Sequence, residues 1–223
     1  MNNSWDVRVQ AVAALEEPTR RRLYEYVVGR PAPVSRDEAA SALGLARTTA
    51  AFHLDKLTEE GLLDTCYERR TGRTGPGAGR PAKLYHRSDR EIEITLPERQ
   101  YAVAGHLLAA AIQDAEDEAI LPREAVNRRA RAYGETLGRT GTDLTEVLEA
   151  HGFEPRPDGD AIALANCPFR RLAAEYPRLV CGMNLNLLTG LLETVGETGM
   201  QAQLDPQATG CCVRLVSSPG GEE

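Results

Sequence analysis

The sequence predicts an α+β fold that is mainly helical, and three observations lead to this fold class. Apolar residues recur at helical spacing over most of the chain. Two strand-like segments flank a Gly-rich loop within the first ninety residues, and short strand-like segments return near the C-terminus. The chain of 223 residues is long enough to bury a core, and 42% hydrophobic against 26% charged residues excludes general disorder.

The charge is distributed unevenly along the chain. The net charge is −7, which taken alone disfavours binding to a polyanion. Residues 1–90, however, carry a net charge of +3, whereas residues 91–223 carry −10. Within 69–90 the net charge reaches +6. Because a local concentration of positive charge matters more than the total, residues 1–90 are a candidate nucleic-acid-binding domain.

The first ninety residues predict helices followed by a hairpin. Ser35 and Glu38 form the pattern of a capping box, and Gly44 suits the turn after the short helix that follows. The expected helices are Val7–Ala14, Thr19–Val28 after Pro18, the short helix through Leu43, and Arg47–Glu60. The expected strands are Leu62–Arg70 and Ala82–Arg87, which flank the Gly-rich loop 71–80.

This order of elements is that of a winged helix-turn-helix, in which the second helix of the pair enters the major groove. Once Ala50, Leu54 and Leu57 are buried, the helix from Arg47 has a polar face left over. We expect double-stranded DNA to be contacted by this face and by the hairpin. The expected contact residues are Arg47, Thr48, Thr49, Phe52, His53, Lys56, Arg73, Arg80 and Lys83. A nucleotide site in the Gly-rich loop is disfavoured, because the loop lacks the Gly-Lys-Ser/Thr ending of a P-loop.

Residues 17–63 resemble the ArsR-type winged-helix regulators. The resemblance lies in Glu17-Pro18-Thr19-Arg20-Arg21-Arg22-Leu23, in the stretch from Ala42 to Leu57, and in Glu60-Gly61-Leu62-Leu63. The family often has Ser at the position of Ala51 and a Ser or Thr cap at that of Ala46. The resemblance therefore implies the domain rather than each individual base contact.

The remainder of the chain predicts a long helix and a smaller α+β domain. Apolar residues at helical spacing mark a helix from Pro97 to Ile120, whose stripe suits the seam of a homodimer. We therefore expect a DNA-binding domain at 1–90, a linker and dimerisation helix at 91–120, and a sensor domain at 121–223. Within the last part the expected helices are 123–137, 143–151, 169–175 and 178–194, and the expected strands are Ala161–Ala165, Ala202–Leu204 and Cys212–Val216.

Four of the five cysteines form candidate ligands in the last part of the chain. Pro168 and Pro177 suit first helical positions, which would place Cys167 at an N-cap and Cys181 in the first turns of a helix, where free amides favour thiolates. Cys211 and Cys212 enter a predicted strand, on which neighbours point to opposite faces, so we expect only one of the two to join the others. Thiolates in apolar surroundings suit a soft, multinuclear metal centre.

This tail is similar to the C-terminal domain of SufR-type iron–sulfur regulators. The similarity rests on Asn166-Cys167-Pro168-Phe169, on Leu179-Val180-Cys181-Gly182-Met183-Asn184 and on Gly210-Cys211-Cys212-Val213. It implies a homodimeric repressor of iron–sulfur cluster assembly genes that binds a palindromic operator, with DNA affinity set by occupancy of a 4Fe–4S or 2Fe–2S cluster. The ligand that completes the set stays open among Cys212, Asn184, a carboxylate and a small molecule.

Other interpretations of the cysteines remain. A zinc site of three cysteines and a further ligand would give a zinc-stabilised regulator without redox sensing, and buried structural cysteines would give no metal site. A thiol oxidoreductase that uses Cys167 is disfavoured, because the sequence contains no CxxC pair, so we expect no enzyme. Cys66 lies outside these motifs and is expected to be a packing residue.

With no apolar run long enough for a bilayer and no signal peptide, a cytoplasmic location without a membrane partner is expected.

Overall fold

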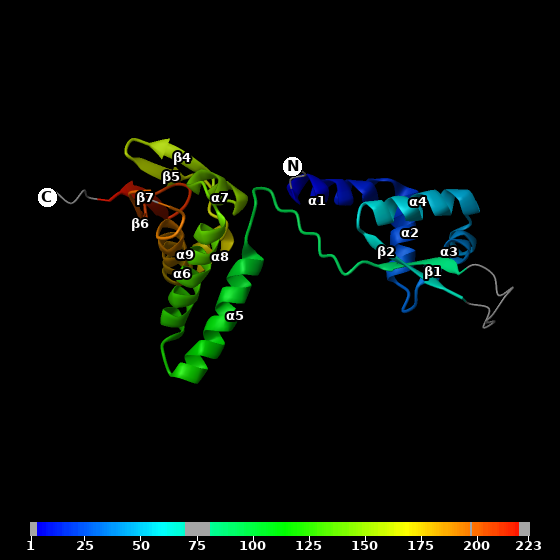
Figure 1. Ribbon diagram of the computed structural model, residues 1–223, viewed down its shortest axis with the longest axis horizontal. Helices are drawn as coiled ribbons and strands as arrows, with labels where there is room; N and C mark the ends of the chain where they lie inside the picture. The colour runs from blue at the N-terminus through cyan, green and yellow to red at the C-terminus, as the bar shows by residue number, and fades with distance from the viewer. Residues whose placement is uncertain (1–3, 70–80, 197, 219–223) are drawn as a thin grey trace. The chain divides into compact units, whose positions relative to one another are not determined.

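The computed structural model describes residues 4–69, 81–196 and 198–218. The chain divides into two compact units, Met1–Ile94 and Thr95–Glu223, which are described separately below (Figure 1). The predicted loop 71–80, with Arg73 and Arg80, lies outside the described residues.

The first unit combines a helical layer with a small antiparallel sheet. Its helices are α1 (Ser4–Ala13), the 3₁₀ turn η1 (Ala14–Glu16), α2 (Pro18–Val28), α3 (Arg36–Leu43) and α4 (Arg47–Glu59). Its strands are β1 (Val34–Ser35), β2 (Leu63–Glu68) and β3 (Ala82–Arg87), in the order β1-β3-β2. The core includes Leu23 of α2, Leu54 of α4 and Leu63 of β2, none of which is exposed.

Local signals in the sequence place most of these elements. Pro18 occupies the first turn of α2, Ser35 and Glu38 form the predicted capping box of α3, and Gly44 ends that helix with φ of +66°. These three predictions are confirmed. The strand β1 was not predicted, because a two-residue strand, Val34–Ser35, carries no periodicity and its second residue also caps α3. The strand β1 forms because it pairs with β3, with Val34 opposite Tyr85 and Ser35 opposite Leu84.

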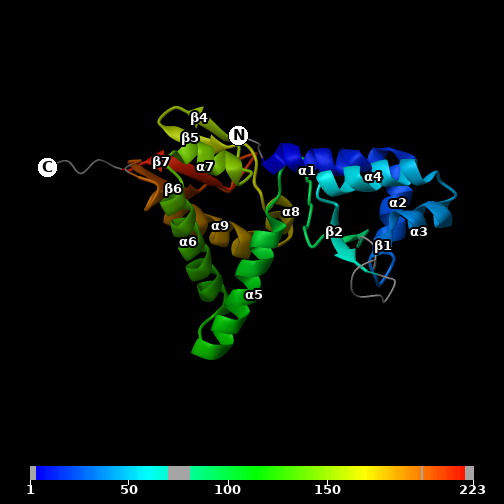
Figure 2. The same cartoon turned by 45° about the vertical axis from the view of Figure 1, so that its right-hand side comes forward.

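The second unit packs helices against a four-stranded antiparallel sheet (Figure 2). Its helices are α5 (Tyr101–Glu118), α6 (Pro122–Thr140), α7 (Leu144–Ala150), α8 (Arg170–Glu175) and α9 (Pro177–Leu192). Its strands are β4 (Pro155–Asp158), β5 (Ala161–Leu164), β6 (Met200–Leu204) and β7 (Val213–Ser217), in the order β4-β5-β7-β6. In the described part of the chain, no helix is long and apolar enough to cross a membrane.

Two elements of the second unit differ from the sequence prediction. The stretch 152–160 was expected to be turns, yet it contains β4. Pro155 and Pro157 fit there because β4 is an edge strand, where a missing N–H costs no ladder bond. Helix α5 begins at Tyr101 rather than Pro97. It packs on α6, and its Ala104 and Ala111 belong to the core of the second unit, so this helix is part of that unit's fold.

Helices α6 and α9 approach each other unusually closely, and glycines permit it. A Cβ atom added at Gly134 of α6 would lie 1.9 Å from the Leu187 carbonyl oxygen of α9. A Cβ atom added at Gly190 of α9 would lie 2.1 Å from the Arg131 carbonyl oxygen of α6. The two backbones therefore meet without intervening side chains. The Thr194 hydroxyl, just after α9, donates to the Glu135 carbonyl at 3.0 Å across the same seam.

This seam makes a substitution at Gly134 costly. We expect Gly134→Ala to lower the free energy of unfolding of the second unit by about 1–3 kcal/mol or more, because the added methyl forces the helices apart. Gly105→Ala in α5 is the matched control, since its Cβ meets nothing within 4 Å, and it should stabilise slightly. Urea unfolding of both variants checks this. Equal stability of the two would contradict the close packing.

Candidate DNA-binding surface and cysteine site

Helix α4 presents an exposed face at its N-terminal half. Arg47 and Thr48 are exposed, and Phe52 is 66% exposed, which is unusual for a large apolar side chain. Thr49 lies half-buried beside them. Guanidinium and hydroxyl groups at the start of a helix can reach base edges and phosphates, and an exposed ring can contact a thymine methyl group. This face is therefore the candidate DNA-binding surface.

Three predicted DNA-contacting cations, Arg47 and Lys56 of α4 and Lys83 of β3, are each paired with an acid. Arg47 Nε lies 2.6 Å from Asp37 Oδ1, Lys56 Nζ lies 2.8 Å from Glu60 Oε1, and Lys83 Nζ lies 2.6 Å from Asp55 Oδ1. Exposed ion pairs of this kind contribute only about 0.2–1 kcal/mol. Phosphates can therefore replace the carboxylates at small cost, and the pairs hold the side chains in place until then.

Two predicted contact residues lie in a different position from the rest. The His53 side chain is only 13% exposed, and its Nδ1 lies 3.6 Å from the Glu17 carboxylate at the start of α2. Lys83 bridges β3 to α4 through Asp55, which also accepts a hydrogen bond from the Tyr85 hydroxyl at 2.7 Å. Although partial burial raises it, the pKa of Asp55 is lowered overall by these two donors. Both residues connect elements of the domain.

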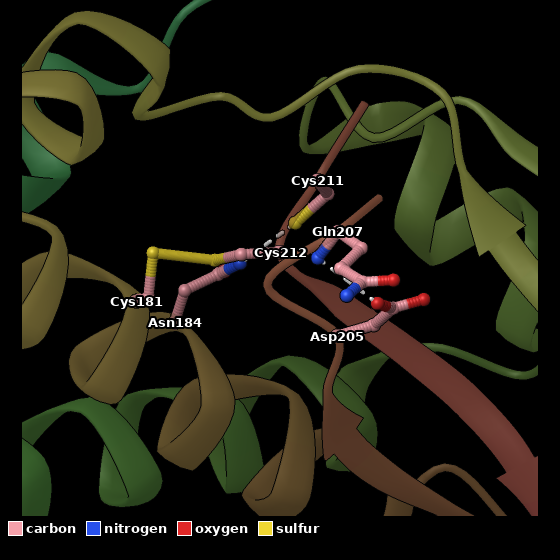
Figure 3. The surroundings of a disulfide bond; sticks show 6 residues. All are labelled: Cys181, Asn184, Asp205, Gln207, Cys211 and Cys212. Atoms are coloured by element: carbon pink, nitrogen blue, oxygen red, sulfur yellow. Dashed lines mark hydrogen bonds between the residues drawn. A yellow bond between two sulfur atoms is a disulfide. The ribbon is translucent and has the colours of Figure 1, made fainter. Parts of the chain in front are cut away.

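The cysteine site lies where the loop between β6 and β7 meets α9 (Figure 3). Cys212 is joined to Cys181 by a disulfide bond with a Cα–Cα separation of 6.4 Å. The neighbouring Cys211 accepts a hydrogen bond from the Asn184 side-chain amide, with Nδ2 3.1 Å from Sγ. Cys181 and Asn184 are three residues apart on α9 and thus share a face. The two consecutive residues Cys211 and Cys212 therefore each contact a residue on the same turn of α9.

The strand geometry from which one of Cys211 and Cys212 was expected to join the site is absent, whereas which of the two serves as a ligand stays a prediction. The strand β7 begins at Val213, so Cys211 and Cys212 precede it, and their side chains need not point to opposite faces of the sheet. Both reach the site: Cys212 contacts Cys181, and the buried Cys211 contacts Cys167. Metal-binding thiolates were expected at these positions, whereas the structure has a disulfide between Cys181 and Cys212.

The backbone around the cysteine pair is held on both sides. The Cys211 amide donates to the Leu164 carbonyl at 2.9 Å, and the Asp205 amide donates to the Cys212 carbonyl at 2.7 Å. Gly210 is required just before them, because a Cβ atom there would lie 2.4 Å from the Leu164 carbonyl oxygen. The two sulfurs are therefore placed by the ends of β5 and β6.

Cys167 reaches the same site from the segment between β5 and α8. It is buried, and it lies three residues before α8 begins at Arg170, so the predicted N-cap position is wrong. A hydrogen bond from the Cys211 thiol lowers the pKa of Cys167 despite burial, and the Phe169 amide and the Arg99 and Arg170 guanidinium groups lower it further. The same contact raises the pKa of Cys211. The amide effect that the sequence suggested is thus present without a helix N-cap.

A hydrogen-bonded clamp holds this segment to the start of the second unit. The Arg99 guanidinium donates to the Asn166 side-chain oxygen at 2.6 Å and to the Cys167 carbonyl at 2.8 Å. The Asn166 amide donates to the Gly152 carbonyl at 2.6 Å, and the Gln100 amide donates to the Pro168 carbonyl at 3.1 Å. Arg99 was not predicted from the sequence, because it fell within the expected helix Pro97–Ile120, whereas α5 begins only at Tyr101.

A cavity of about 470 Å³ opens beside the cysteines. Cys167, Cys181 and Cys212 line it, whereas Cys211 lies deeper, against Asn184. The Asn184 side-chain oxygen is buried and has no hydrogen-bond partner among the described residues. Within residues 4–69, 81–196 and 198–218, no group of three or more His, Cys, Asp or Glu side chains is arranged to hold a metal ion. Cys66 lies on β2, in the other unit.

Residues 15–66 match a family model described as a helix-turn-helix domain. The match runs from η1 into β2 and includes α4 with its exposed face. This class of domain binds DNA in transcriptional regulators, and the first unit is such a domain. Comparisons with curated proteins and with solved structures gave no match for the chain.

The exposed face of α4 predicts the effect of substituting Arg47. We expect Arg47→Gln to weaken binding to a duplex selected by the wild-type protein from a random-sequence pool by about 1–3 kcal/mol, since one charged contact is lost. Arg22→Gln removes the same charge from an exposed position on α2 and should have little effect. Titrations by fluorescence anisotropy at one salt concentration measure both. Equal losses would indicate general electrostatics rather than the α4 face.

The disulfide predicts the number of free thiols. Air-oxidised protein, denatured without reductant, should titrate three thiols per chain, from Cys66, Cys167 and Cys211. Cys181→Ser should release one more thiol by freeing Cys212, whereas Cys66→Ser should remove one. Five thiols in the oxidised wild-type protein would contradict the pairing.

Proposed function

We propose that the chain is a transcriptional regulator, most simply a repressor, whose DNA affinity is controlled by an iron–sulfur cluster held by its C-terminal cysteines. The cysteine part of the proposal is supported by the way that four cysteines come together in space. Cys167, Cys181, Cys211 and Cys212 come from three separate segments and lie at one place in the second unit. A structural disulfide accounts for Cys181 and Cys212, but it does not account for Cys167 at the wall of the same cavity.

The donor set fits such a cluster in its chemistry. Thiolates are the ligands that iron–sulfur clusters use, and Cys167, Cys181 and Cys212 all line the cavity. Cys181 and Cys212 become available as ligands once their disulfide is reduced. Asn184 and Cys211 would stand behind these three, and the unpartnered Asn184 oxygen leaves a polar group available to a bound centre or its ligands. A bound cluster would supply sensitivity to iron supply and to oxidants.

The clamp of Arg99 and Asn166 offers a route from the cysteines to the DNA-binding unit. Residues 98–100 follow the first unit closely in the chain and are hydrogen-bonded to residues 166–168 around Cys167. A change at Cys167 would therefore act on the segment that leads into α5. Regulation then requires that the occupied site favour one arrangement of the two units over the other.

A homodimer is part of the proposal. Helix α5 buries one side against α6 and leaves Ile112 55% exposed, and Leu121 just beyond it is 72% exposed. Pairing of this face with a second copy would cover both side chains. Two DNA-binding units in a dimer would suit a palindromic operator, with its half-sites roughly 34 Å apart.

Metal analysis of anaerobically purified protein tests the cofactor. We expect iron and acid-labile sulfide in near-equal amounts and an absorbance spectrum that bleaches in air. Cys167→Ala and Cys181→Ala should lose both elements, whereas Cys66→Ala should retain them, since Cys66 lies on β2 in the other unit. Zinc without sulfide would favour a zinc-stabilised regulator, and iron retained by the Cys167 and Cys181 variants would contradict the ligand assignment.

A further inference from the structure

The cavity beside the cysteines has a disulfide in its wall. Both Cys181 and Cys212 line it, and both are partly exposed. The third lining cysteine, Cys167, is buried. The rest of the wall consists mainly of small or apolar residues, namely Ala173, Ala174, Pro177, Leu204, Pro206, Ala208 and Gly210. A volume of about 470 Å³ is within the range of sites for small organic molecules.

The charge of the cavity is positive although the unit that contains it is acidic. Arg170 of α8 and Arg178 of α9 line the cavity, and its described lining includes no Asp or Glu. Neither guanidinium forms an ion pair with any described residue; Arg170 has a long contact of 3.5 Å to the Thr209 carbonyl. Arg178 and Cys181 are three residues apart on α9 and therefore share a face. An anion that enters the cavity would meet both cations next to the disulfide.

We propose that this cavity binds an anionic low-molecular-weight thiol, which reduces the Cys181–Cys212 disulfide by exchange. The entering thiolate forms a bond to Cys212 Sγ, the bond between Cys181 and Cys212 breaks, and Cys181 leaves as a thiolate beside Arg178. A second thiolate then attacks the sulfur of the bound small molecule and releases Cys212. Two thiols are oxidised to one small disulfide, and the protein gains two electrons and, from solvent, two protons.

This inference goes beyond the proposed function, because the exchange needs neither DNA nor a metal centre. It specifies instead how the oxidised site would be converted into free thiolates and which class of small molecule would do so. Its failure would leave the metal analysis above unaffected.

Three thiols that share one two-carbon chain but differ in the charge of their end group test the charge preference of the cavity. The full-length oxidised protein is treated with 2-mercaptoethanesulfonate, 2-mercaptoethanol or cysteamine, and rates are divided by the thiolate concentration. Free thiols are counted after acid quench, and mass spectrometry identifies the mixed disulfide on Cys212. We expect the anionic thiol to react at least about tenfold faster than the cationic one, because clustered charge raises the local concentration of a counter-ion.

The arginine variants decide whether the cavity is responsible. Arg170→Gln combined with Arg178→Gln should remove most of this preference, whereas Arg171→Gln, an exposed neighbour that does not line the cavity, should retain it. Circular dichroism verifies that each variant is folded. Equal corrected rates for the three thiols would overturn the proposal, as would the same loss of preference in the Arg171 variant, which would indicate the general field of the protein.

Discussion

The close packing of α6 on α9 is the constraint on which the second unit depends. Gly134 and Gly190 let the two backbones touch, so α9 has little freedom to shift or rotate. Cys181 and Asn184 lie on this helix, and Cys211 and Cys212 are placed against them by the ends of β5 and β6. A soft or mobile α9 would spread these sulfurs over many positions. The packing of two helices therefore determines whether the cysteines can act together.

The two units differ in charge, in line with the different ligands proposed for each. The first ninety residues are net positive, and α4 holds its cations in weak pairs that phosphates can replace. The second unit is strongly acidic overall, yet Arg99 and Arg170 act on Cys167, and Arg178 lines the adjoining cavity. In that unit positive charge is thus concentrated where thiolates or anionic ligands would need it.

The sequence predicts elements well where local chemistry decides them. Ser35 with Glu38, Gly44, Pro18 and Pro177 each set an element boundary through capping or a fixed φ, and the structure has them as expected. Elements that exist through distant partners were missed: β1 forms only because β3 pairs with it, and β4 is an edge strand despite its two prolines.

The cysteine site could likewise be predicted from the sequence only in part. The motifs single out Cys167, Cys181, Cys211 and Cys212, but the partner of each depends on how β5, β6 and α9 meet. Because β7 begins only at Val213, alternation along a strand does not determine where Cys211 and Cys212 point. The pairing of Arg99 with Asn166, which lies 67 positions away, could not be read from the sequence either. Such contacts have no local signal in one sequence.

The coupling between the two units is the central claim, and DNA affinity measured in two states of the site tests it most directly. Wild-type protein is titrated anaerobically onto a duplex selected from a random-sequence pool, once with the metal centre reconstituted and once after its removal by chelation, at the same salt concentration. The account predicts affinities that differ by at least about tenfold, equivalent to about 1.4 kcal/mol of coupling. Equal affinities in the two states would contradict control of DNA binding by the cysteine site.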